Sequence, residues 1–435
     1  MRALLVFWLF LLSAIAFLDR TNISIAGPQI SREFGLGNIR LGWVISAFLV
    51  GYAASQVLAG WAAVQLGARR ALTLGVLWWG AFTLATALVP PGMRGALWVL
   101  IGVRCALGVG EAIIYPASNQ FVARWVPVSE RGRANGVIFA GVGAGAGLTP
   151  PLLVAIIASH GWRAAFWFSA VLGVIAGVVW FAIARDTPEE HPLVSNEELS
   201  RIRAGVGQVR QSNVVKGPVP WRTILFSRTL LLLTFACFCF GYIAWIFLGW
   251  FYLYMAQARG VNLKASAVYT MFPFLAMTVF CLAGGVIGDW IAARHGLRAG
   301  RCGPGFFSLL VAAGLLIVGS RVESAPMAAM TLAAGAGALY VSQSSYWSVT
   351  ADIAGENAGV VSSVMNMGAQ IGGAVTASLT PWIAQRFGWT TSFLVAALLG
   401  AAGAVAWLGV DPETKLEAAA QIGRSAERAA PAKSV

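Results

Sequence analysis

The stretch RCALGVGEAIIYPASNQFVARWVPVSERGRA, residues 104–134, decides the fold, because an apolar helix with two charges runs here into a basic, proline-marked turn. From about Leu97 to Ser118 the chain is apolar enough to cross a bilayer, yet Arg104 and Glu111 lie inside this span. An ionisable side chain at the centre of a span costs roughly 2.5 to 3.5 kcal/mol on insertion scales. Such charges therefore face a water-filled cavity or an opposite charge.

The spacing of these two charges shows that they do not neutralise each other. Arg104 and Glu111 lie on the same helix face, about 10 Å apart along the axis, which is too far for an ion pair. Each needs a partner from another helix. Asp19 and Arg20, in the first apolar segment, are the other charges that we place inside a span. We therefore predict that two acids and two bases share one interior.

Composition places the chain among polytopic membrane proteins. Of its 435 residues 58% are hydrophobic and only 11% charged. The net charge of +13 could suggest a nucleic-acid partner. However, the basic residues are distributed over short loops between apolar runs, so the positive-inside bias explains them and we predict no nucleic-acid binding. The cysteines and histidines show no disulfide or metal-ligand spacing, so we predict no metal or cofactor.

The apolar runs predict an all-α polytopic membrane protein with twelve transmembrane helices. Most of the 30 Lys and Arg residues fall on one side of these runs, which puts both termini in the cytoplasm. The first run continues past Asp19 without a cleavage site, so it is predicted to be a retained helix rather than a signal peptide. The runs cover residues 3–27, 41–64, 71–89, 97–118, 135–158, 164–184, 229–255, 266–288, 303–320, 325–347, 359–384 and 390–410.

The two halves of the chain resemble each other. GWRAAFWFSAVLG at 161–173 aligns without gaps on GWTTSFLVAALLG at 388–400, and both segments follow the fifth run of their half. This order favours parallel six-helix repeats with a binding site between them. The predicted layout is two six-helix bundles joined by a cytoplasmic linker and followed by a frayed cytoplasmic tail, with boundaries at 1–184, 185–228, 229–410 and 411–435.

The pattern resembles the major facilitator superfamily, and within it the anion:cation symporter branch, whose members carry organic anions with protons or sodium. The resemblance covers nearly the whole chain and implies the major facilitator fold in a bacterial inner membrane. The motifs that carry it are Asp19-Arg20-Thr21-Asn22, Tyr52 and Gln56 before Gly60-Trp61, RCALGVGEAIIYPASN at 104–119, and the turn from Trp125 to Ala134.

The resemblance assigns roles to the four interior charges. Asp19, Arg20, Arg104 and Glu111 match the family's coupled set in the N-terminal half. Arginine stays charged and offers a planar fork to a carboxylate, whereas a buried acid beside arginine can exchange protons. We therefore expect Arg20, with Arg104, to bind the anion, and Glu111, with Asp19 in support, to take the proton. The alternative is that the four charges form two permanent salt bridges with a structural role.

Further residues are predicted to contact substrate. They are Tyr52 in the second span and Asn366 and Gln370 in a glycine-rich eleventh span, where Gln370 stands at a position that the family pattern gives to asparagine. Packing or interhelical hydrogen bonding explains these three residues equally well. The weaker candidates are Ser342, Ser345 and Tyr346.

The cytoplasmic loops depart from the family pattern at one point. The family has an Asp-Arg pair after the second span, where this chain has Val64 and Gln65, so one cytoplasmic latch is predicted to be weakened. The later copy of the motif, GGVIGDW at 284–290, retains Asp289, with Arg294 beyond it. We predict that these two residues act in gating.

Together these features predict a transporter that imports an organic anion with a proton by alternating access. A monomer is the default, because one chain supplies both halves of the pathway. Aldonates, aldarates, aromatic and short carboxylates all remain open, as does sodium in place of the proton. The alternatives are an uncoupled facilitator or exporter, and a non-transporting sensor built on a carrier scaffold. A membrane-embedded enzyme is disfavoured, because catalytic clusters are not found in the sequence.

Overall fold

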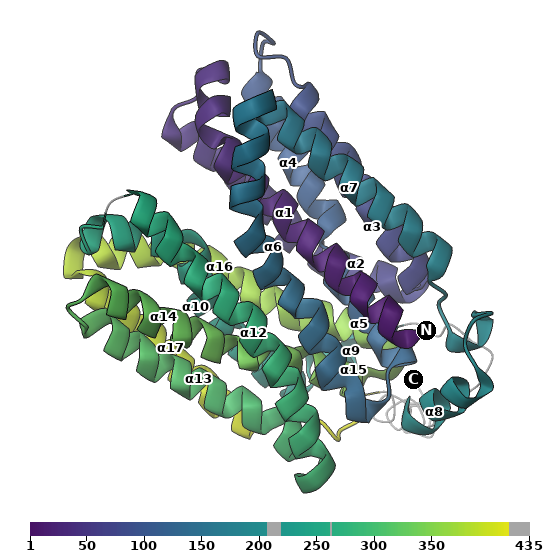
Figure 1. The fold of residues 1–435 in the computed structure, drawn as a ribbon. Helices are drawn as coiled ribbons and strands as arrows, with labels where there is room; N and C mark the ends of the chain where they lie inside the picture. Colours follow the sequence, from purple (N-terminus) through teal and green to yellow (C-terminus); the bar gives the residue numbers. More distant parts are fainter. Residues whose placement is uncertain (207–218, 262, 417–435) are drawn as a thin grey trace, which may run out of the picture.

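The computed structural model describes residues 1–206, 219–261 and 263–416, and in this part of the chain the regular structure is helical throughout. The helices form two bundles that converge near the start of α1 and diverge toward the opposite end (Figure 1). The predicted frayed tail, apart from residues 411–416, lies outside the described residues. So does the middle of the predicted linker.

The first bundle contains six spans, and the fourth of them is broken. Residues 112 and 113 interrupt that span, so that α4 and α5 share one crossing. The helices are α1 (Arg2–Phe34), α2 (Asn38–Leu66), α3 (Ala68–Leu88), α4 (Ala96–Glu111), α5 (Ile114–Trp125), α6 (Arg131–His160) and α7 (Trp162–Ile183), with a short turn at Val128–Glu130.

The second bundle follows a connecting region that contains a turn at Pro188–Glu190 and the helices α8 (Asn196–Val206) and α9 (Trp221–Leu225). Its tenth span is also broken, at Ser342. The helices are α10 (Arg228–Gly249), α11 (Phe251–Leu253), α12 (Leu263–His295), α13 (Leu297–Arg321), α14 (Ala325–Val341), α15 (Gln343–Ala354), α16 (Ala358–Phe387) and α17 (Trp389–Leu408), with turns at Tyr254–Ala258 and Gly355–Asn357.

Eleven helical segments among the described residues are long and apolar enough to cross a membrane, and one of them represents two crossings. The segment Ala325–Phe387 has 63 residues. At about 1.5 Å per residue it would be about 95 Å long, roughly three times the thickness of the hydrocarbon core. It folds instead as α14 with α15, and then α16. The prediction of twelve transmembrane helices in two bundles is confirmed.

The internal repeat is visible in the packing and in the turns. In the first bundle α1 packs on α6, α2 on α4 and α3 on α7, and the corresponding pairs in the second bundle are α10 with α16, α12 with α14 and α13 with α17. Tight turns at Gly161 and Gly388 have φ of 78° and 85°. A positive φ of this kind favours glycine, which explains why both copies of the repeated segment begin with Gly-Trp.

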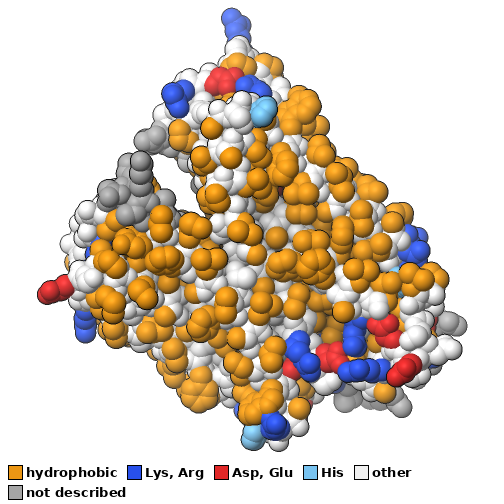
Figure 2. Space-filling model, in the orientation of Figure 1, with side chains coloured by type: hydrophobic (Ala, Val, Ile, Leu, Met, Phe, Trp, Pro, Cys, Tyr) orange, Lys and Arg blue, Asp and Glu red, His pale blue; other side chains and the backbone are white. Residues whose placement is uncertain are grey.

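Hydrophobic side chains cover a broad band of the surface, whereas charged side chains gather at the two ends (Figure 2). Large apolar residues such as Trp98, Phe307 and Leu398 are more than half exposed. A soluble protein would not leave so many apolar side chains in water, so this band is the lipid-facing surface.

Glycines allow α2 and α4 to cross closely, and this contact provides a stability test. A Cβ atom on Gly108 would lie 2.2 Å from the carbonyl oxygen of Phe48, so Gly108→Val must push the two helices apart. We expect this substitution to lower the free energy of unfolding by about 1 to 3 kcal/mol. Thermal unfolding in detergent measures it. Gly102→Val on the same helix is the control, because a Cβ there meets nothing within 4 Å, and equal losses in both variants would contradict the packing argument.

The two bundles contact each other at the end that carries Met1 and Lys415, which we call the termini face. There α6 packs on α12 and α15, and α16 packs on α2 and α5. A Cβ on Gly285 would lie 2.3 Å from the carbonyl oxygen of Gly132, so this crossing tolerates only a hydrogen at that position. The molecule is therefore closed at the termini face and open at the other end.

Candidate functional site

The structure places the four interior charges in the first bundle, as the sequence predicts. Asp19, Arg104 and Glu111 are each at most 1% exposed, and the Arg20 side chain is 13% exposed. Arg20 Nε donates to Glu111 Oε1 and forms an ion pair with it. The partner of Glu111 therefore comes from another helix, as its seven-residue separation from Arg104 requires.

The second pair, Asp19 with Arg104, is not formed in this conformation. Thr83 on α3 donates its hydroxyl hydrogen bond to Asp19 Oδ2, while Asp19 Oδ1 and the Nε and Nη1 atoms of Arg104 have no hydrogen-bond partner. Among the described residues Arg104 forms no ion pair within 4.0 Å. The alternative of two permanent salt bridges therefore does not describe this conformation.

Phe48 on α2 contacts both interior arginines. Its ring centroid is 5.5 Å from the guanidinium carbon of Arg20 and 5.3 Å from that of Arg104. Both cations are therefore close enough to the ring for a cation–π interaction. Arg20 also lies over the rings of Phe17 and Tyr52, at 4.6 and 4.7 Å. These contacts hold the Arg20 guanidinium at the boundary between the bundles.

A cavity of about 70 Å³ lies beside Arg20 and is lined by both bundles. Three of its lining residues have a buried polar atom without a hydrogen-bond partner: Arg20 Nη2, Tyr52 Oη and Asn366 Nδ2. All three atoms can donate, so together they can bind a carboxylate. The lining residues are Phe17, Arg20, Tyr52, Tyr115, Phe139, Val142, Phe240, Gly241, Ala244, Trp245, Leu248, Tyr340, Gln343, Trp347, Asn366, Ala369 and Gln370.

The cavity brings together Arg20, Tyr52, Asn366 and Gln370, the predicted substrate-binding residues, but not Arg104. Arg104 is buried outside the lining, against Phe48. Glu111 is also outside it, paired to Arg20. The arrangement therefore makes Arg20 the one predicted arginine that a substrate in this cavity can touch.

Sequence reasoning missed part of the cavity wall. Gln343 and Trp347 of α15 line it, whereas the weaker candidates Ser342 and Tyr346 donate hydrogen bonds to backbone carbonyl groups. The reason is the helix break at Ser342, which decides the face that α15 presents to the cavity. The polar run after residue 341 was the only signal, and it does not give that face.

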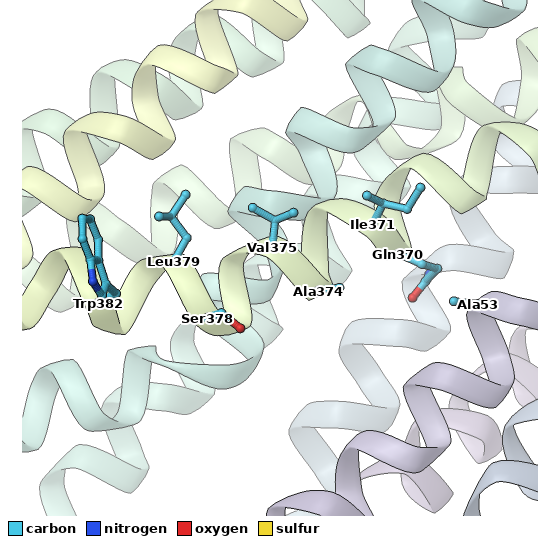
Figure 3. A pocket seen from close by; sticks show the side chains of 8 residues that line it. All are labelled: Ala53, Gln370, Ile371, Ala374, Val375, Ser378, Leu379 and Trp382. Carbon is cyan, nitrogen blue, oxygen red and sulfur yellow. The ribbon is translucent and has the colours of Figure 1, made fainter.

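An open, mostly apolar cleft of about 630 Å³ continues from the cavity along α16 (Figure 3). Gln370 lines both spaces. The cleft runs from there toward Trp382, away from the termini face, which shows that the cavity lies on the open side of the molecule. Its other lining residues are Ala53, Ile371, Ala374, Val375, Ser378 and Leu379.

A buried ion-pair chain closes the termini face below the cavity. Arg131 of the first bundle pairs with Asp352 at 2.7 Å, Asp352 with Arg301 at 3.0 Å, and Arg301 with Asp289 at 2.8 Å. The Asp289 carboxylate also accepts hydrogen bonds from the backbone N–H groups of Gly132 and Arg133, at 2.9 and 2.7 Å. A carboxylate at a helix N-terminus is favourable, so Asp289 attaches α12 to the start of α6 across the interface.

The structure does not bring Arg294 into this cluster. Arg294 is five residues after Asp289, so its side chain lies about 140° around α12, where it is exposed and stacks 4.1 Å from the ring of Trp290. Its predicted place beside Asp289 is taken by Arg301 of α13. Neither Arg301 nor Asp352 can be singled out from the sequence, because their pairing depends on contacts between helices far apart in the chain.

Two uncharged residues, Val64 and Gln65, stand where the family pattern has the Asp-Arg latch after the second span. Val64 has no polar group, and the N-terminus of α16 is instead bound by Gln120 of α5, which accepts from the Gly359 amide at 2.9 Å and donates to the carbonyl oxygen of Glu356 at 2.8 Å. The latch predicted to be weakened is therefore replaced by an uncharged contact between the bundles.

Removing this contact is expected to open the termini face more often. In Gln120→Ala, the Gly359 amide loses its acceptor, and we expect a buried cysteine introduced by Ser363→Cys between α2 and α16 to be alkylated several-fold faster, in a background without native cysteines. Gln120→Glu is the matched control, since it keeps an acceptor at the helix N-terminus. Equal alkylation rates in the Gln120→Ala variant and its parent would contradict a closing role for Gln120.

Two repeated bundles, a cavity with charged and polar groups between them, and a closed contact at one end are typical of a membrane transporter. The family model of the Major Facilitator Superfamily matches residues 9–377 and 350–434. The chain belongs to this family, and it is a multi-pass membrane transporter rather than an enzyme.

Individual relatives support the resemblance to the anion:cation symporter branch. The chain is 34% identical over 403 residues to the probable sulfoacetate transporter SauU of Cupriavidus necator, covering 92% of this chain and 91% of that protein. It is 28% identical to the hexuronate transporter of Bacillus subtilis, covering 90% of each. Among solved structures, the proton:xylose symporter XylE bound to 6-bromo-6-deoxy-D-glucose has a TM-score of 0.73 at 15% identity, covering 96% of this chain and 100% of that chain. This last likeness concerns the fold alone.

Proposed function

We propose that the chain imports an organic anion together with a proton across the inner membrane of a bacterial cell. The observation that carries this proposal is the Arg20–Glu111 pair, which lies next to a cavity with three unpartnered donors. The names of the relatives support organic anions as the substrate class but do not fix the number of charges, because sulfoacetate carries two anionic groups and hexuronate carries one.

Competition between Glu111 and the substrate carboxylate for Arg20 would couple anion binding to proton binding. While Glu111 is ionised, it occupies one edge of the Arg20 guanidinium and weakens its attraction for an incoming carboxylate. Protonation of Glu111 removes that competitor, and a bound anion in turn removes the partner that keeps Glu111 ionised. Proton and anion therefore favour each other's binding, which is the thermodynamic requirement for symport.

Asp19 and Arg104 have a supporting role in this scheme. Arg104 does not line the cavity, so we assign it to the electrostatic balance of the two acids rather than to direct substrate contact. Asp19, held by Thr83, is the second acid that can take a proton. This assignment changes the sequence-based prediction for Arg104 from substrate binding to positioning.

The expected orientation supports import. The bias of basic residues favours cytoplasmic termini, and in that orientation the cavity would be open to the outside and closed to the cytoplasm by the Asp289 cluster and Gln120. This is the conformation in which an importer would load its substrate. The bundles would then rock about the cavity to release it.

Uptake by purified protein in proteoliposomes tests the proposal. A panel of aldonates, aldarates, aromatic carboxylates and short carboxylates is offered with an acidic exterior, and solute uptake and external pH are followed together. We expect at least one anion to accumulate, with matching alkalinisation outside. Uptake that ignores the pH gradient would indicate the facilitator instead, and binding without any uptake would indicate the sensor.

A further inference from the structure

We propose that the substrate carries a single negative charge, as a monocarboxylate with a neutral body, and that the uncharged cavity wall of the second bundle excludes dianions. This inference rests on the proposed function and narrows its substrate class. The sequence left aldonates, which carry one carboxylate, and aldarates, which carry two, equally open. The wall opposite Arg20 distinguishes between them.

Arg20 is the only cation among the described residues that line the cavity. Arg104 lies against the ring of Phe48 and is outside the cavity lining. The second bundle contributes amides, aromatic rings and small apolar residues, with Gln343, Asn366 and Gln370 as its hydrogen-bonding side chains. One carboxylate therefore has one place to bind, at Arg20, Tyr52 and Asn366.

A second anionic group on the same molecule would face this neutral wall. Removing an ionised group from water without a counter-charge is strongly unfavourable, and amide groups compensate only part of that cost. The cleft that continues from Gln370 offers no relief, because its described lining, from Ala53 to Trp382, is also uncharged. Hydroxyl, carbonyl or apolar groups suit this wall, since the three amides can both donate and accept.

The net charge around Arg20 is also neutral when one anionic group is bound there. Arg20 carries one positive charge, and Glu111 neutralises it when the site is empty. After Glu111 takes a proton, one carboxylate on the substrate restores neutrality around Arg20. A second carboxylate would need a further cation, and Asp19 and Arg104 do not supply one to the cavity because neither lines it.

The experiment compares matched anions in the proteoliposome assay at pH 7, where ordinary carboxyl groups are ionised. Gluconate is paired with glucarate, and butyrate with succinate, each against the best labelled anion found in the panel. We expect that anion to be a monocarboxylate, and the monoanion of the better pair to inhibit uptake at least ten-fold more strongly than its dianion. A dianion that is transported as well as any monoanion would overturn the inference while leaving proton-coupled transport intact.

A gain-of-function variant supplies the missing cation. Gln343→Lys, with Gln370→Lys as a second variant if the first does not fold, is expected to improve inhibition by the dianion relative to the monoanion by at least ten-fold. Gln343→Met is the neutral control and should leave the ratio unchanged. An unchanged ratio in correctly folded lysine variants would contradict the role of the neutral wall. If no anion in the panel is taken up with protons, the proposed function itself fails and the inference falls with it.

Discussion

The Arg20→Lys variant is expected to lose anion uptake by about 100-fold, although it keeps the positive charge. Lysine has no planar fork, so one ammonium group cannot contact Glu111 and present a second donor to the cavity as the Nε and Nη2 atoms of Arg20 do. Losing one partner of a buried, hydrogen-bonded charge pair costs about 2 to 5 kcal/mol, which brackets this factor. Uptake of the labelled anion at a fixed pH gradient is the measurement.

The control for this variant lies on the same helix. Arg32, near the end of α1, is exposed on the open side, and among the described residues its hydrogen bond is to the carbonyl oxygen of Pro28. Arg32→Lys should therefore transport at the rate of the parent protein. If Arg20→Lys and Arg32→Lys transported equally well, a charge without directional hydrogen bonds would be enough at the cavity, and Arg20 would lose its role as the carboxylate fork.

Most of the architecture is predictable from the sequence because the bilayer imposes a simple rule on it. A span needs about 20 apolar residues, and the polar breaks between spans are short. Gly-Trp recurs at 161 and 388 and indicates the internal repeat, because both bundles need a glycine with positive φ at this turn. Hydropathy does not show the breaks inside spans, at residues 112–113 and at Ser342, because apolar residues continue through the first break and the polar run after residue 341 does not mark where the helix is interrupted.

The candidate site is only partly predictable from the sequence. Charges inside spans can be recognised there, whereas residues that act through contacts between the bundles cannot. A charge inside a span is visible because it is expensive there, so Asp19, Arg20, Arg104 and Glu111 could be selected from the sequence. The roles of Arg301, Asp352 and Gln120 depend on contacts between the bundles. Glutamine, and charged residues near the end of a span, are ordinary at those positions in a single sequence, so nothing distinguishes them before the helices are placed.

The Glu111→Gln variant is expected to separate proton coupling from anion movement. A glutamine at 111 cannot ionise, so it leaves Arg20 without a competing anion at every pH. We expect accumulation driven by a pH gradient to fall at least ten-fold, whereas exchange of labelled for unlabelled anion stays within a few-fold of the parent protein. Uptake and exchange are measured on the same proteoliposomes, so protein lost during reconstitution affects both equally.

The dependence on pH makes this prediction specific to coupling. In the parent protein, anion binding should strengthen as the pH falls, because protonated Glu111 releases Arg20. In Glu111→Gln it should be strong and independent of pH, since the competitor is absent. Asp19→Asn is the companion variant, and it should weaken coupling less, because Asp19 is bonded to Thr83, whereas Glu111 is the acid that pairs with Arg20. Gradient-driven accumulation that persisted undiminished in both variants would remove the two acids from the coupling mechanism and return them to a structural role.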